Sequence, residues 1–240
     1  GLIAIKRRLK SITSTKKITK AMGLVATAKL RKSKEKLYAN EKYYSALEES
    51  INEILANHSG YNIYKNGNKS NKKLYIILTS DSGLCGGFNG NVLNRAMEEI
   101  NKDRENSLSI VVGEKGSAFF KRMKIKPSNE FLDISDLPTV KELKGVVTEG
   151  LSLYEKGEVG EVYVVYAKFL TSIKQEVQVE KLLPFKYDVN NEDSFKDKDY
   201  VKFEPEVDVI LNNAVLLYMR ERIFYSMLHS KTSEQSARMA

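Results

Sequence analysis

The sequence predicts an α/β protein in which the N- and C-terminal helices form a long antiparallel coiled coil beside an α/β domain. Residues 1–57 contain no proline and repeat apolar side chains every seven residues. Residues 72–190 alternate between strand-like and helix-like segments, and residues 205–240 return to a helical repeat. We therefore expect a first coiled-coil helix (1–57), an α/β domain (72–190) and a second, incomplete coiled-coil helix (205–240).

The first segment is expected to form one uninterrupted helix, since Gly23 is its only internal glycine. One heptad phase places its apolar residues on two seam positions, the first with Leu2, Leu9, Leu30, Leu37, Tyr44 and Ile51, the second with Ile5, Ile12, Ala26, Leu47 and Ile54. In the middle, Ile18, Met22 and Val25 form the apolar face instead. A helix of this length measures roughly 80 Å. It is too long for burial in a chain of 240 residues, so we expect a rod.

The central part reads as a Rossmann-like α/β domain. Residues 59–73 form a polar linker, and residues 80–90 form a glycine-rich loop. Strands are expected at 74–79, 109–112, 162–169 and 175–183, and helices at 91–102, 117–123 and 140–154. The last strand alternates apolar and polar residues, which predicts an exposed or edge position in the sheet.

The second long helix has a clear start signal. Pro205 suits the first turn of a helix, and the acids Glu206 and Asp208 suit its N-terminus, after a charged, irregular stretch at 186–204. Val209, Leu216 and Ile223 then repeat by seven. The segment reaches residue 240 without a glycine or proline stop signal, so we expect the native helix to continue.

Positive charge is concentrated at the N-terminus. Residues 1–42 hold thirteen Lys or Arg and two acids, about +11, whereas the whole chain carries +8. A basic end on a mildly acidic body predicts an anionic partner, which could be nucleic acid, lipid headgroups or an acidic protein surface.

Composition narrows the class of protein. No apolar run approaches the ~18 residues of a membrane span, and the N-terminus carries charges where a signal peptide needs an apolar core. We therefore expect a soluble cytosolic chain. Cys85 is the only cysteine, and His58 and His229 are the only histidines. These counts exclude a disulfide framework and disfavour both a zinc site and a cysteine nucleophile with a histidine base.

Two features invite a chemical interpretation. The loop Ser80–Asn89 follows a strand and opens a helix, where phosphates often bind, but it lacks the spacing of both common glycine-rich phosphate motifs and has no phosphate-binding lysine. A structural turn is favoured over a nucleotide site. The basic run Lys29–Lys36 could follow nucleic-acid phosphates or lie on lipid. Its helical seam favours a protein interface over a solvated face, and a solvated face over nucleic acid.

Three stretches resemble the gamma-subunit family of F-type ATP synthases. These are Lys17–Lys32, Ser80–Asn89 and Ser233–Met239. In this order, between two long helices, they make the resemblance specific over essentially the whole chain.

The resemblance implies a function for the chain. It implies the central rotor shaft, whose rotation couples transmembrane ion flow to ATP synthesis or hydrolysis at the beta subunits. It implies no catalytic residue and no cofactor. The implied partners are the alpha and beta subunits of the catalytic ring, the epsilon subunit and the membrane c-ring, with one copy per complex and no nucleic acid. The implied location is peripheral, at the cytoplasmic face of the bacterial plasma membrane.

The resemblance also implies which residues face the alpha/beta ring: Lys17, Lys20, Met22, Arg31, Asp81, Cys85, Gly86, Glu234, Gln235 and Arg238. Relative to the family pattern, the first residues and about the last forty positions, with the tip of the shaft, are expected to be missing. The chain lacks the cysteine-rich insertion of chloroplast forms, which favours a bacterial origin.

Overall fold

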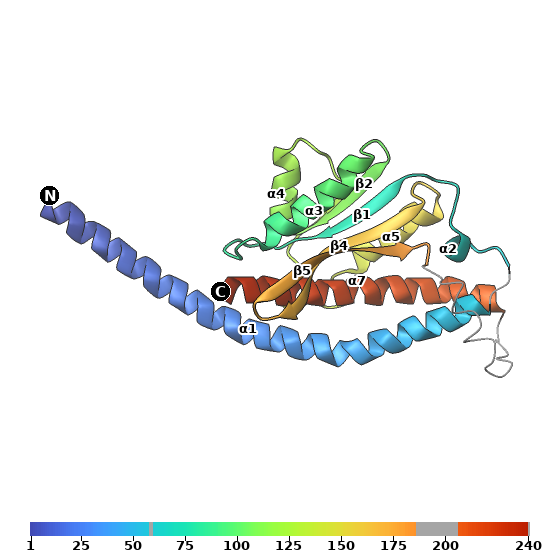
Figure 1. Ribbon diagram of the computed structural model, residues 1–240, viewed down its shortest axis with the longest axis horizontal. Coiled ribbons are helices and arrows are strands. Elements are labelled where there is room, and N and C mark those ends of the chain that lie inside the picture. Colours follow the sequence, from blue (N-terminus) through green and yellow to red (C-terminus); the bar gives the residue numbers. More distant parts are fainter. Residues whose placement is uncertain (58–59, 186–205, 240) are drawn as a thin grey trace.

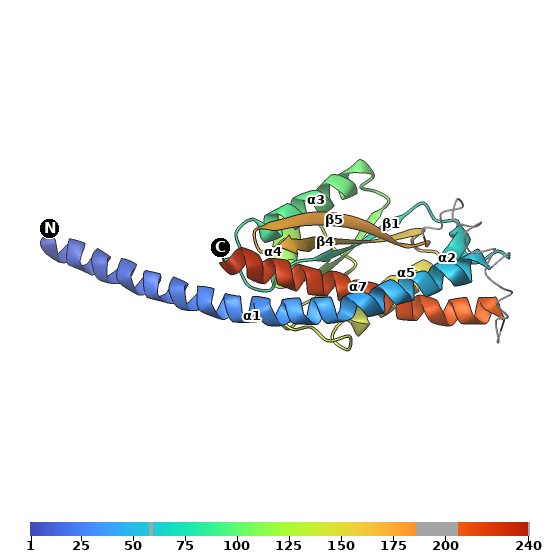
Figure 2. The same ribbon diagram turned by 60° about the horizontal axis from the view of Figure 1, so that its bottom comes forward.

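A computed structural model describes residues 1–57, 60–185 and 206–239, so that His58, Pro205 and the stretch 186–204 lie outside the described residues. Two helices, α1 (Leu2–Ala56) and α7 (Val207–Met239), run side by side in opposite directions, with an α/β domain along one flank (Figures 1 and 2). The predicted fold class is confirmed. None of the described helices has the length and apolar character that crossing a membrane requires.

The predicted seam is buried where α1 faces α7. Ala26, Leu30, Leu37, Tyr44 and Ile51 are all buried on this side of α1. The ring of Tyr44 stacks on Tyr225 of α7, with ring centroids 4.6 Å apart and an interplanar angle of 5°. Such a stack adds to the free energy gained from burying the two rings.

The N-terminal part of the seam differs from this. Leu2, Ile5, Leu9 and Ile12 are between 59% and 69% exposed, and α1 projects well beyond the α/β domain (Figure 1). Met239, at the end of α7, lines a surface hollow together with Gly23 of α1. The seam residues before this point therefore have no described helix opposite them.

The long helix α1 is bowed, with its concave side toward the α/β domain (Figure 1). The hydroxyls of Thr13, Thr15, Thr19 and Thr27 each donate to the carbonyl oxygen four residues earlier, at 2.8 to 3.1 Å. Hydrogen bonds of this type compete for helical carbonyls and often bend helices. They give a local cause for part of the bow.

The α/β domain is built on a five-stranded sheet in the order β3-β2-β1-β4-β5. The strands are β1 (Lys73–Leu78), β2 (Ser107–Val112), β3 (Asn129–Phe131), β4 (Glu161–Thr171) and β5 (Lys174–Leu183). Neighbours pair in parallel except β4 and β5, which form an antiparallel hairpin. The prediction that the last strand lies at an edge is confirmed.

Helices cover both faces of the sheet. On one face, α3 (Phe88–Lys102) and α4 (Glu114–Arg122) pack over Tyr75 and Ile77 of β1. On the other face, α5 (Lys144–Glu155) and α7 pack over Leu74 and Ile76, and α1 lies against α7 (Figure 1). Alternate residues of the buried strand β1 thus belong to two separate apolar cores, as the pleat requires.

Two short elements were not predicted from the sequence, the helix α2 (Ile63–Asn66) and the strand β3. Both are too short for a periodic pattern to show. The helix expected at 140–154 begins at Lys144 instead, because Glu142 holds the preceding turn by accepting hydrogen bonds from the backbone N–H groups of Ser135 and Thr139.

His229 is a neutral histidine in the core between α7 and β4. Its side chain is buried, its Nδ1 accepts a hydrogen bond from the N–H of Phe169 at 3.3 Å, and its ring meets Tyr225 edge-on. Burial, aided by the positive charges of Lys168 and Arg222, lowers the pKa of His229 to about 4.

Folding stability should therefore fall as the pH drops from about 6.5 to about 4. In this window the unfolded chain binds a proton at His229 and the folded chain does not, which costs up to about 3 kcal/mol. We expect denaturant unfolding at a series of pH values to show this slope, and His229→Gln to remove most of it between pH 6.5 and about 5, above the range in which carboxylates with lowered pKa values such as Asp136 and Glu142 add their own slope. An equal slope in both proteins would contradict the assignment.

Candidate functional site

The part of α7 just before its last turn is buried on every side. Every residue from Ser226 to Ser236 is buried, although most of these side chains are polar. The serines recur every three or four residues and lie close to neighbouring backbone: Ser233 Oγ donates to the carbonyl of Ala167 at 3.0 Å, and Ser236 Oγ to that of Ser172 at 2.6 Å. Small side chains thus let α7 approach β4 and the β4–β5 turn closely.

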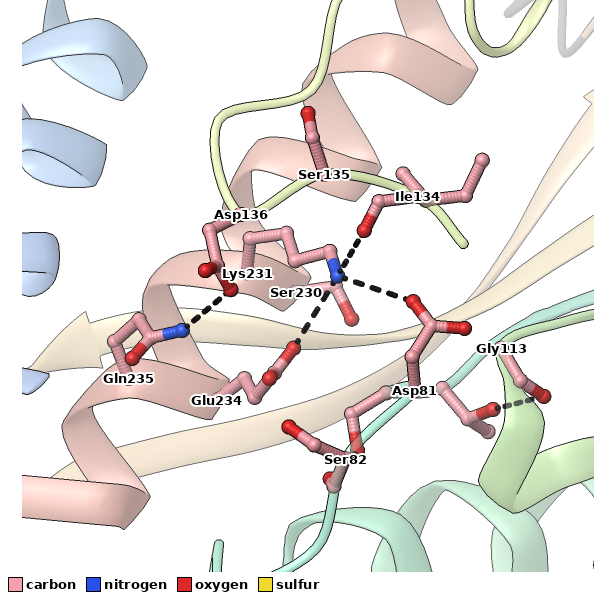
Figure 3. Close-up of polar contacts among 12 residues, drawn as sticks. Asp81, Ser82, Gly113, Ile134, Ser135, Asp136, Ser230, Lys231, Glu234 and Gln235 are labelled. Carbon is pink, nitrogen blue, oxygen red and sulfur yellow. Dashed lines mark hydrogen bonds and ion pairs between the residues drawn. The ribbon is translucent and has the colours of Figure 1, made fainter. Parts of the chain in front are cut away.

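We call the contact between the end of α7 and the α/β domain the junction. Lys231 lies at its centre and is 3% exposed (Figure 3). Its Nζ donates to the carbonyl oxygen of Ile134 at 2.9 Å and lies 3.7 Å from Asp81 and 3.6 Å from Glu234. A buried ammonium needs such partners, because an unpaired charge in the interior is very costly.

Asp81 connects the glycine-rich loop to two other segments. Its Oδ1 accepts hydrogen bonds from the backbone N–H of Glu114, in the first turn of α4, and of Asp133, each at 3.1 Å. The glycine-rich loop is thus tied through its own carboxylate to the first turn of α4 and to the segment at Asp133. This arrangement favours the structural interpretation of the loop over a nucleotide site.

The rest of the glycine-rich loop is also held by internal contacts. Cys85 is 3% exposed, and its Sγ accepts a hydrogen bond from Asn89 Nδ2 at 3.2 Å. Asn89 Oδ1 accepts a hydrogen bond from the N–H of Ser80 at 3.0 Å. Gly86 adopts φ +53°, a conformation that other residues rarely take. These features describe a tight turn packed against α3.

Asp136 joins both long helices to the α/β domain. Its carboxylate accepts hydrogen bonds from Lys29 Nζ of α1 at 2.6 Å and from Gln235 Nε2 of α7 at 3.0 Å. Burial by itself would raise the pKa of Asp136, but the hydrogen bond and charge of Lys29 outweigh it and hold that pKa below its usual range.

Arg238 extends the network to the surface. Its guanidinium donates to Glu234 at 2.7 Å and to the hydroxyl of Ser82 at 2.8 Å. The end of α7 is thereby fixed to the glycine-rich loop.

An open apolar groove of about 490 Å³ lies beside this network. Ile18, Met22 and Val25 of α1 line one side, and Leu84 of the glycine-rich loop lies opposite. Leu84 is 75% exposed and adopts φ +59°, which is uncommon for a side chain of its size. An exposed apolar surface with basic residues nearby is suited to a protein partner.

The structure brings together six of the residues expected at an interface: Asp81, Cys85, Gly86, Glu234, Gln235 and Arg238. Of these, Cys85, Glu234 and Gln235 are buried, so they support the surface from beneath. The other four lie along α1, where Lys17, Lys20 and Arg31 are exposed and Met22 lines the groove. Their contact with a partner stays a prediction.

Lys231 and Asp136 were not identified from the sequence. Apart from Glu234, their partners lie about 100 to 150 positions away along the chain. The small residues spaced along the end of α7 were the available signal, because they indicate close helix packing.

Comparison with known proteins agrees with this fold. The sequence model of a family described as ATP synthase matches residues 1–240. A relative from Clostridium novyi, described as an ATP synthase gamma chain, is 51% identical over 240 residues, which cover all of this chain and 83% of the relative. A gamma chain from Clostridium pasteurianum is 48% identical with the same coverage.

A solved structure titled as the central stalk and c-ring of Tetrahymena thermophila mitochondrial ATP synthase contains a chain of the same fold. The TM-score is 0.72 at 24% identity, covering 92% of this chain and 96% of that one. Because the family model matches residues 1–240, this chain is a subunit of the ATP synthase class. Within that class, it belongs to the family of ATP synthase gamma chains.

Replacing Lys231 by Met should destabilise the folded chain by about 3 kcal/mol, because Asp81 would lose the counter-charge of Lys231 and the buried Glu234 would keep Arg238 but lose its second one. The loss should appear as a lower denaturant midpoint with an unchanged slope. Lys121→Met is the matched control, since Lys121 pairs with Glu130 at an exposed position and should change stability by less than about 0.5 kcal/mol. Equal effects of the two substitutions would contradict the role given to Lys231.

Proposed function

We propose that this chain is the central rotor shaft of an F-type ATP synthase. Its rotation couples transmembrane ion flow to ATP synthesis or hydrolysis at the beta subunits, and the chain itself supplies no catalytic residue. The observation that carries the proposal is the projection of the basic end of α1 beyond a firmly joined α/β domain (Figure 2). Membership of the ATP synthase gamma-chain family also supports the proposal.

A shaft must resist twisting, and the features of the junction suit that requirement. We assign 1–57 and 205–240 to the shaft and 72–190 to the α/β domain at its foot. The two helices share a buried seam, and α7 is held to the sheet by apolar and polar contacts together. Torque applied to the α/β domain would thus reach both helices.

The proposed partners match the distribution of charge along the chain, which is strongly basic in the N-terminal part of α1. Alpha and beta subunits would surround the shaft, and the epsilon subunit and the membrane c-ring would bind the foot, in one complex with one copy of this chain. Lys17, Lys20 and Arg31, with Met22 in the groove, would face acidic loops of the ring. In bacteria this places the chain at the cytoplasmic face of the plasma membrane as a peripheral subunit.

Assembly tests the proposal directly. The tagged full-length gene product should co-purify with alpha and beta subunits from the same organism in a ratio of one tagged chain per ring, and the assembly should hydrolyse Mg-ATP. Recovery of the folded chain alone, beside folded alpha and beta subunits, would contradict the proposed function.

Charge reversal on α1 should impair coupling more than folding. Lys20→Glu combined with Arg31→Glu replaces attraction to acidic loops by repulsion, and Arg31 is 82% exposed in its side chain, so stability should change little. We expect ATP-driven ion pumping by reconstituted enzyme to fall several-fold, with a normal melting temperature. Arg95→Glu, on the outer face of α3, is the control. Normal pumping by the double variant would contradict the proposed interface.

A further inference from the structure

We propose that Asp136 is a positioning residue that fixes the register of the two long helices and ties both of them to the α/β domain under load. The inference rests on the proposed function, because it concerns how torque passes through this chain. It assigns a mechanical role to a loop of the α/β domain, residues 133–138, which we name the strap.

The strap lies against both helices at the level where α1 leaves the α/β domain. Asp136 accepts hydrogen bonds from Lys29 of α1 at 2.6 Å and from Gln235 of α7 at 3.0 Å. One carboxylate thus contacts both helices at one level (Figure 3 shows the contact with Gln235). A sliding or rotation of α1 past α7 would break at least one of these hydrogen bonds.

Neighbouring contacts hold the strap itself in place. Lys231 of α7 donates to the carbonyl of Ile134 at 2.9 Å, and Lys36 of α1 donates to the carbonyl of Pro138. Asp81 accepts the N–H of Asp133 at 3.1 Å. The strap is therefore bonded to α1, to α7 and to the loop after β1, so Asp136 is presented from a fixed base.

The position of Asp136 along the rod matters for its proposed role. Before Ala26, α1 has exposed seam residues, and from Ala26 onward its seam is buried against α7. Lys29 lies at this boundary and is 41% exposed in its side chain. A bending or twisting force on the projecting part of α1 would act first at the boundary, where apolar packing alone allows slippage between neighbouring seam positions. Directional, charge-assisted hydrogen bonds oppose such slippage.

The decisive measurement is the ratio of ions pumped to ATP hydrolysed by the intact enzyme in lipid vesicles. We expect Asp136→Ala to lower this ratio at least three-fold while ATP hydrolysis stays within about two-fold of wild type. The exchange Lys29→Asp with Asp136→Lys restores an ion pair between α1 and the strap but not the acceptor for Gln235 of α7, so it should recover part of the lost ratio but not all of it. Glu99→Gln is the matched control, since the ion pairs of Glu99, with Arg95 and Lys102, lie within α3.

A purely structural role for Asp136 gives a different result. In that case Asp136→Ala would lower the melting temperature and the amount of assembled enzyme, but each assembled complex would pump with the wild-type ratio, which would overturn the inference. A wild-type enzyme that assembles and pumps independently of this chain would instead overturn the proposed function. The two failures are thus distinguishable.

A second measurement reports on how firmly α1 is held to the α/β domain without relying on activity. Spin labels are attached to cysteines introduced by Lys32→Cys in α1 and Lys121→Cys in α4, both at exposed positions. The native thiol is removed by Cys85→Ser so that it does not react. The distribution of label distances in the assembled enzyme should broaden at least two-fold with Asp136→Ala and narrow again in the exchanged pair. An unchanged distribution in Asp136→Ala would overturn the inference.

Discussion

Complete burial of residues 226–236 of α7 is the constraint on which the rest of the structure depends. A helix can be covered by a sheet, a second helix and two loops at once only if its side chains are small where the backbones approach. Ser230 and Ser233 meet this requirement. Buried polar groups there need partners, and Lys231, Ser230 and Ser233 find them in the strap, the glycine-rich loop and the carboxyl ends of β1 and β4. The same contacts therefore define both the helix position and the loop conformations.

Charge is distributed differently in the fixed and the projecting parts of the molecule. Near the end of α7, the acids Asp81, Asp136 and Glu234 are matched by the bases Lys29, Lys231 and Arg238, and the buried charges of Lys231 and Glu234 in particular require such partners. On the exposed N-terminal half of α1, bases greatly outnumber acids. Balanced charge thus accompanies internal rigidity, and unbalanced charge lies where the chain is expected to meet another molecule.

Most of the fold could be predicted from the periodic spacing of apolar residues in the sequence. The heptad repeat of α1 predicted the rod, and the alternation in β5 predicted an edge strand, because helices and strands each place side chains on one face at a fixed local period. The same repeat could not show that Leu9 is exposed and Leu37 buried, since that depends on where α7 lies. The pairing of Asp136 with Lys29 was likewise invisible, because it joins residues 107 positions apart that only the tertiary fold brings together.

The bow of α1 has a geometric consequence for a molecule that turns. A straight rod of uniform surface presents the same outline at every rotation angle. A bowed rod such as α1 is asymmetric about its axis of rotation, so its outline changes with the angle (Figure 1). Its convex side would lie close to one subunit of a surrounding ring, while its concave side would lie farther from the subunit on the opposite side. Chemically identical neighbours arranged around it would each meet a different profile at the same moment. Inequivalence among equal subunits then requires no change of conformation in the shaft, only a change of its angle.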